Sequence, residues 1–140
     1  MKKVVLTGAN RGIGLALTRQ LLDSGCAVIA TCRAASDELA ASGAEVIDGV
    51  DVCTEAGVAR LAAAIDEPID LLINNAGLLT NETLSDLGID RIRRQFEVNA
   101  LAPLVVTHAL LSKLAPGATV AVITRRMGSL SASPHAARTG

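Results

Sequence analysis

The chain has 140 residues, half of them hydrophobic, with a single aromatic residue, Phe96, and a formal net charge of −1 at pH 7. This length suits one domain with a core of its own. The near-neutral charge gives no electrostatic reason to expect binding to nucleic acid or to an anionic membrane. The three cysteines are odd in number and form no CxxC pair, so we expect reduced thiols in a cytoplasmic protein.

No segment of the sequence indicates a signal peptide or a membrane span. Lys2 and Lys3 precede an apolar run, but Asn10 and Arg11 interrupt that run too soon for a signal peptide. The longest later apolar stretch, residues 101–111, is far short of the ~20 residues that cross a bilayer. We therefore expect a soluble protein that makes no contact with a membrane.

Short aliphatic runs alternate along the chain with longer segments of helical period. The first run, residues 4–7, predicts a strand, and Ile13, Leu17 and Leu21 share one face of the helix that follows it. Gly25 is placed to end that helix. Further strands are predicted at 28–32, 45–47, 69–73 and 119–124, and further helices at 36–42, from 55 to about 65, and from 89 to about 114.

This alternation predicts right-handed crossovers and a parallel sheet with helices on both faces. The expected fold class is therefore α/β, a Rossmann-like doubly wound sheet of about five strands in the order 3-2-1-4-5. We assign residues 1–128 to this dinucleotide-binding domain and residues 129–140, which have no apolar period, to an irregular tail. The sequence contains no His, Cys or carboxylate cluster with metal-ligand spacing, so we expect no metal site.

The turn between the first strand and the first helix carries the most informative motif, TGANRGIG at residues 7–14. Gly8 would allow a tight turn, Gly12 the close approach of a diphosphate, and Gly14 the packing of helix against strand. Three glycines alone could form an ordinary tight turn, but their place at a helix start favours an anion-binding site. The predicted cofactor site at this turn also includes Asn10, Arg11 and Ile13.

The glycine spacing resembles the TGxxxGxG motif of the short-chain dehydrogenase/reductase family. The resemblance continues with Asp51-Val52 after the third strand, with NNAG at residues 74–77 after the fourth, and with Asn99 in the long helix. It follows the family's order up to about Gly128. The resemblance implies that Asp51 and Val52 hold the adenine ring, and that the ribose and diphosphate are lined by Asn75, Ala76 and Gly77.

The second predicted strand bears on the choice of dinucleotide. An NAD-binding chain is expected to carry an acidic residue there, about 20 positions after the glycines. Here the strand ends in Arg33, and the first acidic residues come only at Asp37 and Glu38. Guanidinium groups at Arg33 and Arg11 suit a 2′-phosphate, although both could simply be solvated. We expect NADP rather than NAD as the cofactor.

Active members of the resembling family use an Asn, a Ser, a Tyr and a Lys, and only the Asn has a clear match here, at Asn99. Because Pro103 has no N–H, the Asn99 carbonyl lacks its usual helical partner and could hold a water molecule; a simple proline kink is the alternative. If Gly128 fixes the register, Arg125 occupies the serine position. A guanidinium cannot replace a hydroxyl there.

The sequence has no tyrosine, and its only lysines are Lys2, Lys3 and Lys113. We therefore expect little or no activity from this chain alone. The leading hypothesis is a C-terminally truncated or frame-shifted relative of an NADP-dependent oxidoreductase that transfers hydride between NADP(H) and a carbonyl or alcohol. A non-enzymatic NADP-binding sensor or partner subunit is the alternative, and a catalyst that borrows Tyr and Lys from a second polypeptide is a third hypothesis.

The resembling family continues past this point with further strands and helices that this sequence lacks. Without them the fifth strand would form a sheet edge, which is a risk for aggregation because the strand is apolar and poor in charge. The long helix would also lose a neighbour. We therefore expect a homo-oligomer formed through the long helix or the exposed fifth strand.

Overall fold

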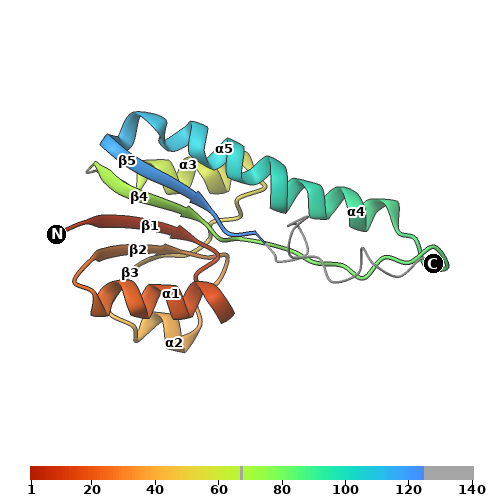
Figure 1. Cartoon of the computed structure of the whole chain (residues 1–140), viewed down its shortest axis with the longest axis horizontal. Helices are drawn as coiled ribbons and strands as arrows, with labels where there is room; N and C mark the ends of the chain where they lie inside the picture. Colours follow the sequence, from red (N-terminus) through yellow and green to blue (C-terminus); the bar gives the residue numbers. More distant parts are fainter. Residues whose placement is uncertain (67, 125–140) are drawn as a thin grey trace, which may run out of the picture.

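The computed structural model describes residues 1–66 and 68–124, and it contains a parallel five-stranded sheet with helices on both faces (Figure 1). The strand order is β3-β2-β1-β4-β5. Both the parallel sense and the order confirm the Rossmann-like prediction. The strands are β1 (Lys3–Thr7), β2 (Ala27–Thr31), β3 (Glu45–Ile47), β4 (Ile69–Asn74) and β5 (Leu114–Val122).

The helices divide between the two faces of the sheet. Helices α1 and α2 cover one face, and α3 and α5 cover the other (Figure 1). Residues 125–140 lie outside the described residues, and with them Arg125 and the predicted tail. The helical segments are α1 (Gly12–Asp23), α2 (Asp37–Ala40), α3 (Glu55–Ala63), α4 (Ile89–Phe96), the π-helix η1 (Glu97–Leu101), α5 (Ala102–Leu110) and the 3₁₀-helix η2 (Leu111–Lys113).

The core consists of two aliphatic layers, one on each face of the sheet. Successive strand residues point to opposite faces, so Val5 packs toward α3 and α5 while Val4 and Leu6 pack toward α1 and α2. Leu61 of α3 and Leu110 of α5 are fully buried in the first layer. Strands buried on both faces need continuous aliphatic runs, and this explains a core with almost no aromatic residues.

Strand β5 begins at Leu114, five residues before the sequence prediction. Ile69 of β4 pairs with Leu114, but Leu71 pairs with Thr119, so the intervening residues of β5 form an irregularity. Regular pairing therefore starts where the apolar run predicted it. Among the described residues β5 pairs with β4 alone and forms one edge of the sheet, and the side chain of Val122 is 48% exposed.

The predicted long helix is present but is not uniform. Four consecutive segments, α4, η1, α5 and η2, run from Ile89 to Lys113, and the π-helix η1 contains Asn99. Pro103 cannot donate to the Asn99 carbonyl, and at this point the hydrogen bonding widens, with the Ala102 amide donating to Glu97 O. Helix α4 has no buried residue and extends beyond the sheet (Figure 1).

None of the helices in the described part of the chain is long and apolar enough to cross a membrane.

Candidate functional site

The carboxyl ends of β1 to β4 lie at one edge of the sheet, and the loops that follow them hold most of the predicted site residues. The turn after β1 is closed by glycines: Gly8 has φ +67° and Gly12 has φ +54°, a left-handed conformation that favours glycine. A Cβ on Gly8 would lie 2.7 Å from the Ala76 Cα. A Cβ on Gly14 would lie 2.1 Å from the Gly8 carbonyl oxygen. The turn therefore packs tightly against the neighbouring loop and against α1.

The outer side of the same turn is open. A Cβ on Gly12 would meet no atom within 4 Å, and the side chain of Ile13 is 63% exposed. Arg11 is the N-cap residue of α1, has extended backbone and makes no capping hydrogen bond through its side chain. The first amides of a helix need acceptors, and a bound anion can provide them. The open side of the turn thus has the geometry of an anion site.

Thr7, at the end of β1, joins this turn to the loop after β4. Its hydroxyl oxygen accepts hydrogen bonds from the amides of Asn75 and Ala76, both at 3.1 Å. The Asn75 side chain adds a third bond in the same direction, since its Nδ2 donates to the Gly8 carbonyl oxygen at 3.0 Å. Sequence reasoning missed Thr7; a buried hydroxyl at the end of an aliphatic strand was the available signal. The glycine turn and residues 75–77 form one hydrogen-bonded unit.

Asp51 and Val52 lie in the loop after β3, next to that unit. Asp51 Oδ1 accepts a hydrogen bond from the Cys53 amide at 2.9 Å, and Arg94 Nη2 lies 3.9 Å from Asp51 Oδ2. A Cβ on Gly57 would lie 2.1 Å from the Asp51 carbonyl oxygen, so glycine is required there for the loop to reach its position on α3. The Asp51 carboxylate is held in a defined orientation at the carboxyl edge.

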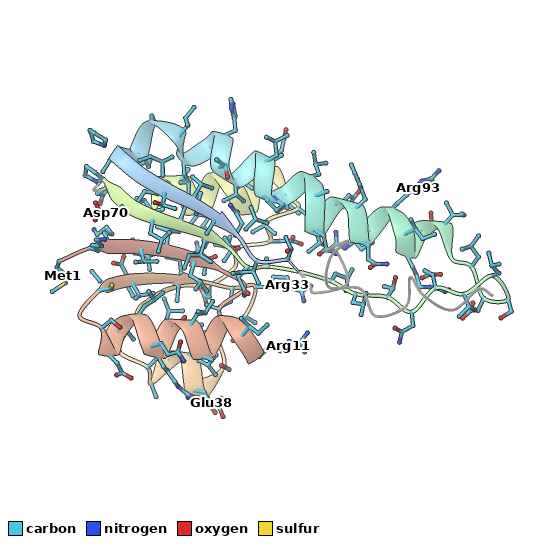
Figure 2. The ribbon with its side chains drawn as sticks, in the orientation of Figure 1. Met1, Arg11, Arg33, Glu38, Asp70 and Arg93 are labelled. Atoms are coloured by element: carbon cyan, nitrogen blue, oxygen red, sulfur yellow. The ribbon has the colours of Figure 1, made fainter. Side chains whose placement is uncertain are left out.

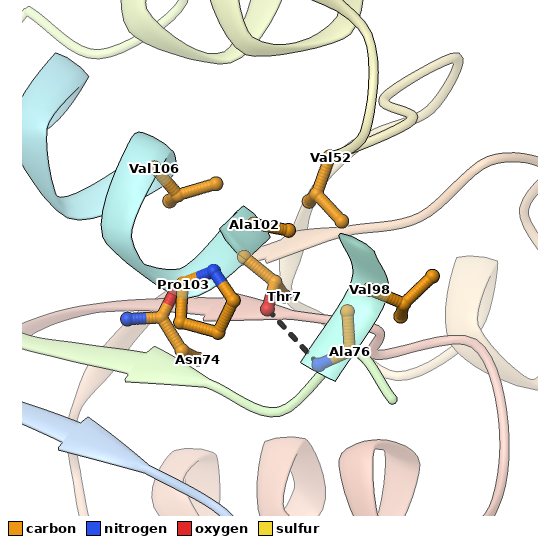
Figure 3. A pocket seen from close by; sticks show the side chains of 8 residues that line it. All are labelled: Thr7, Val52, Asn74, Ala76, Val98, Ala102, Pro103 and Val106. Atoms are coloured by element: carbon orange, nitrogen blue, oxygen red, sulfur yellow. Dashed lines mark hydrogen bonds between the residues drawn. The ribbon is translucent and has the colours of Figure 1, made fainter. Parts of the chain in front are cut away.

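The side chain of Val52 closes a small hollow below this edge (Figure 3). The hollow has an empty volume of about 140 Å³ and no room for the centre of a water molecule. It is therefore a packing seam, and a ligand as large as a nucleotide would have to lie across the open edge above it. The hollow is lined by Thr7, Val52, Asn74, Ala76, Val98, Ala102, Pro103 and Val106.

Asn99 fastens the loop after β4 to the long helix. Its Oδ1 accepts from the Leu78 amide at 2.8 Å, and its Nδ2 donates to the Leu78 carbonyl oxygen at 2.6 Å. One helical turn earlier, Gln95 Nε2 donates to Thr80 Oγ1 at 2.5 Å. Both polar atoms of the Asn99 side chain are thus hydrogen-bonded to the main chain of Leu78. The main-chain carbonyl of Asn99 belongs to the π-helix η1.

Further along the loop after β4, Glu82 forms an ion pair with Arg91 of α4. Arg91 donates to both carboxylate oxygens of Glu82, at 2.7 and 3.0 Å, and the Gly88 amide donates to Glu82 Oε2. The hydrogen bonds from Arg91 and Gly88 lower the pKa of Glu82 to about 2. Together with the contacts of Asn99 and Gln95, this pair fixes residues 78–82 along the helix.

Two predicted cofactor residues, Arg11 and Arg33, are exposed at the same edge of the sheet (Figure 2). The Arg33 carbonyl oxygen accepts from the Gly49 amide at 3.0 Å, which anchors the backbone and leaves the guanidinium in solvent. Lys113 lies at the opposite edge, where its Nζ donates to the Ile65 carbonyl oxygen. Lys113 is therefore remote from the candidate site.

Comparison with known proteins gives the family. Residues 2–136 match the sequence model of a family described as short chain dehydrogenase. The chain belongs to the short-chain dehydrogenase family. A relative from Rhodococcus sp. strain AD45, named 1-hydroxy-2-glutathionyl-2-methyl-3-butene dehydrogenase, is 40% identical over 133 residues, which are 93% of this chain and 59% of the relative.

Solved structures of short-chain dehydrogenases share the fold. A carbonyl reductase from Pseudomonas aeruginosa PAO1 superposes with a TM-score of 0.84 and 30% identity, covering 94% of this chain and 65% of that one. A short chain dehydrogenase from Burkholderia cenocepacia J2315 in complex with NADP gives a TM-score of 0.76 and 27% identity, covering 86% and 54%. The chain therefore spans roughly half to two thirds of the length of these relatives.

The family motifs quoted from the sequence thus come together in space. The glycine turn and residues 75–77 are hydrogen-bonded at the carboxyl edge, and Val52 lines one hollow with Thr7 and Ala76. Asn99 lies on the helix beside them. Arg125, which we expect at the family's serine position, lies outside the described residues. The structure accordingly locates the residues that the sequence predicts for the cofactor site, together with Asn99.

Proposed function

We propose that this chain binds a nicotinamide dinucleotide across the carboxyl edge of its sheet, with the diphosphate on the open side of the Gly8–Gly14 turn. The observation that carries this proposal is the combination of an uncapped helix start with an empty space beside Gly12. Backbone amides and the helix dipole favour an anion there. Asp51 and Val52 would then hold the adenine, and Asn75, Ala76 and Gly77 would line the ribose side.

The cofactor that this site favours is NADP. Arg11 and Arg33 are both exposed at the edge where the adenosine ribose would lie, and guanidinium groups pair with phosphate through charge-assisted hydrogen bonds. A related short-chain dehydrogenase from Burkholderia cenocepacia is solved in complex with NADP. An NAD-selective site would instead offer a carboxylate to the ribose 2′-hydroxyl.

The reaction class is hydride transfer between NADP(H) and a carbonyl or alcohol, as family membership suggests. We propose that these 140 residues by themselves turn over little or not at all, since they contain no tyrosine to act as general acid or base. Lys113 lies at the end of the sheet where β4 begins, opposite the carboxyl ends, and so cannot assist at the site. Robust NADPH oxidation by this chain alone, with a panel of aldehydes and ketones, would contradict the proposal of low turnover.

Nucleotide binding is tested by titrating the purified protein with NADPH and following the fluorescence of the reduced nicotinamide. Gly12→Asp places a carboxylate where the diphosphate would lie, so we expect binding to be lost. Gly43→Asp is the matched control, because Gly43 also has a positive φ and open space around its Cβ position but lies away from the site. Undetectable binding by the parent, or unchanged binding by Gly12→Asp, would show the proposal to be wrong.

We also propose that two copies associate through the exposed face of the long helix. Phe96 and Leu104 are 63% and 67% exposed on it, and apolar side chains in such numbers favour an interface. The β5 edge is the alternative surface. Light scattering after size-exclusion chromatography should show a dimer, and Leu104→Glu should convert it to a monomer. If β5 forms the interface instead, Val122→Glu and not Leu104→Glu should give the monomer.

The cytoplasm is the compartment that we propose. Cys26, Cys32 and Cys53 are free thiols, and burial raises the pKa of Cys32 and Cys53, which keeps both thiols protonated. Reduced, unreactive thiols suit a reducing compartment. Fractionation of the source cells with an antibody against the chain tests this assignment.

A further inference from the structure

The glycine turn after β1 is joined to the segment that carries Arg33 by a pair of hydrogen bonds. The Ser36 amide donates to Asn10 Oδ1 at 2.5 Å, and the Ser36 hydroxyl donates to the Asn10 carbonyl oxygen at 3.0 Å. The same hydroxyl oxygen accepts from the Leu39 amide at 3.2 Å and so caps helix α2. We call the two Asn10–Ser36 bonds the clasp. It connects residues that are 26 positions apart in the sequence.

The clasp holds one end of a short exposed segment whose other end is also fixed. The Arg33 carbonyl oxygen accepts from the Gly49 amide, and the Cys32 carbonyl oxygen accepts from the Val50 amide, both at 3.0 Å. Residues 33–35 between these anchors are exposed. The clasp therefore holds the far end of the segment that begins with Arg33 against the turn that carries Arg11, the neighbour of Asn10.

A phosphate held between two guanidinium groups requires a fixed distance between them, because charge-assisted hydrogen bonds are short and directional. The side chain of Arg33 is solvated and long, so its own rotamers cannot supply that distance. We infer that Ser36 and Asn10 are positioning residues that set the preference for a 2′-phosphate by fixing Arg33 opposite Arg11. This inference rests on the proposed binding of NADP and concerns the same site.

The first test compares Ser36→Ala with the parent by titration with NADPH and with NADH. Ser36→Ala removes the hydroxyl bond to Asn10 and also the cap on the Leu39 amide, and it should weaken NADPH binding about 3- to 10-fold and NADH binding by less than about 2-fold. Ser42→Ala is the matched control. The Ser42 hydroxyl donates to the Leu39 carbonyl oxygen at the end of the same helix α2 but makes no bond to the glycine turn. We expect Ser42→Ala to leave the ratio of the NADPH and NADH affinities unchanged. Ser36→Thr keeps a hydroxyl, and its affinity ratio should therefore be close to that of the parent.

A double-mutant cycle with Arg33→Ala separates positioning from a general loss of structure. If Ser36 acts through Arg33, the Ser36→Ala substitution should have no further effect on NADPH affinity once Arg33 is alanine. An unchanged affinity ratio in Ser36→Ala, or an effect that adds fully to that of Arg33→Ala, overturns the inference even when the parent binds NADPH. A parent that binds neither nucleotide instead overturns the proposed function.

Discussion

Gly14→Ala is the substitution for which the structure gives the sharpest expectation. Gly14 has an ordinary helical backbone, so alanine causes no φ strain, but its Cβ would lie 2.1 Å from the Gly8 carbonyl oxygen and 2.7 Å from Asn75 Nδ2. The first of these distances is about 1.3 Å shorter than the 3.4 Å at which ordinary contact begins. Neither the carbonyl nor the start of α1 can move by that amount without breaking the packing of helix on strand.

The expected cost combines two effects. Overpacking costs about 1–3 kcal/mol, and loss of the hydrogen bond from Asn75 to Gly8 adds about 1 kcal/mol. A loss of about 2–4 kcal/mol corresponds to a fall in Tm of about 8–16 °C for a domain of this size. Differential scanning calorimetry of the parent and of Gly14→Ala, both without nucleotide, measures this difference. If Gly14→Ala melts within about 2 °C of the parent, which corresponds to less than about 1 kcal/mol, the close approach of α1 to Gly8 is refuted.

Three further predictions concern the loops of the carboxyl edge. Arg33→Ala should weaken NADPH binding about 10-fold or more and leave NADH binding nearly unchanged, as measured by parallel titrations. The pKa of Glu82 is lowered to about 2 from 4.5, so its ionised form stabilises the folded chain above pH 4.5, and this contribution is lost as the pH falls toward 2. Glu82→Gln should therefore lower the urea midpoint at about pH 6 but not at about pH 2, and an equal decrease at both would count against the contact with Arg91. Asn99→Ala removes both bonds to Leu78, so the Leu78 amide should exchange with deuterium faster, while slow exchange in that variant would show that another group holds the loop.

The fold could be predicted from the sequence because its signals are local. The aliphatic runs and the helical period that includes Leu17 and Leu21 specify buried strands and amphipathic helices without knowledge of their partners. Ile13, predicted on the same face, is instead 63% exposed at the start of α1. The glycine turn was also predictable, since Gly8 directly follows β1 and Gly12 and Gly14 lie in the first turn of α1. Boundaries were predicted less accurately: β5 starts earlier than its apolar run, because pairing with Ile69 resumes across an irregularity.

The contacts that shape the candidate site depend on distant pairings and could not be predicted in this way. Nothing in the sequence indicates that Ser36 bonds to Asn10, or that Gly57 must be small to admit the Asp51 carbonyl. Pro103 did point to a disturbed helix, but whether the chain forms a kink or a π-helix depends on how it packs. Such contacts follow from the fold and can be identified only once the strands are in place.

The attachment of the loop to the long helix sets a numerical constraint on both. Asn99, Gln95 and Arg91 follow one another at intervals of four residues, and their partners on the loop, residues 78, 80 and 82, at intervals of two. Four helical residues advance about 6 Å and two extended residues about 6.6 Å, so the two repeats are nearly commensurate. Insertion of a single residue between positions 78 and 82 would shift Glu82 out of register with Arg91 while Leu78 stays bonded to Asn99, and would so uncouple the two segments.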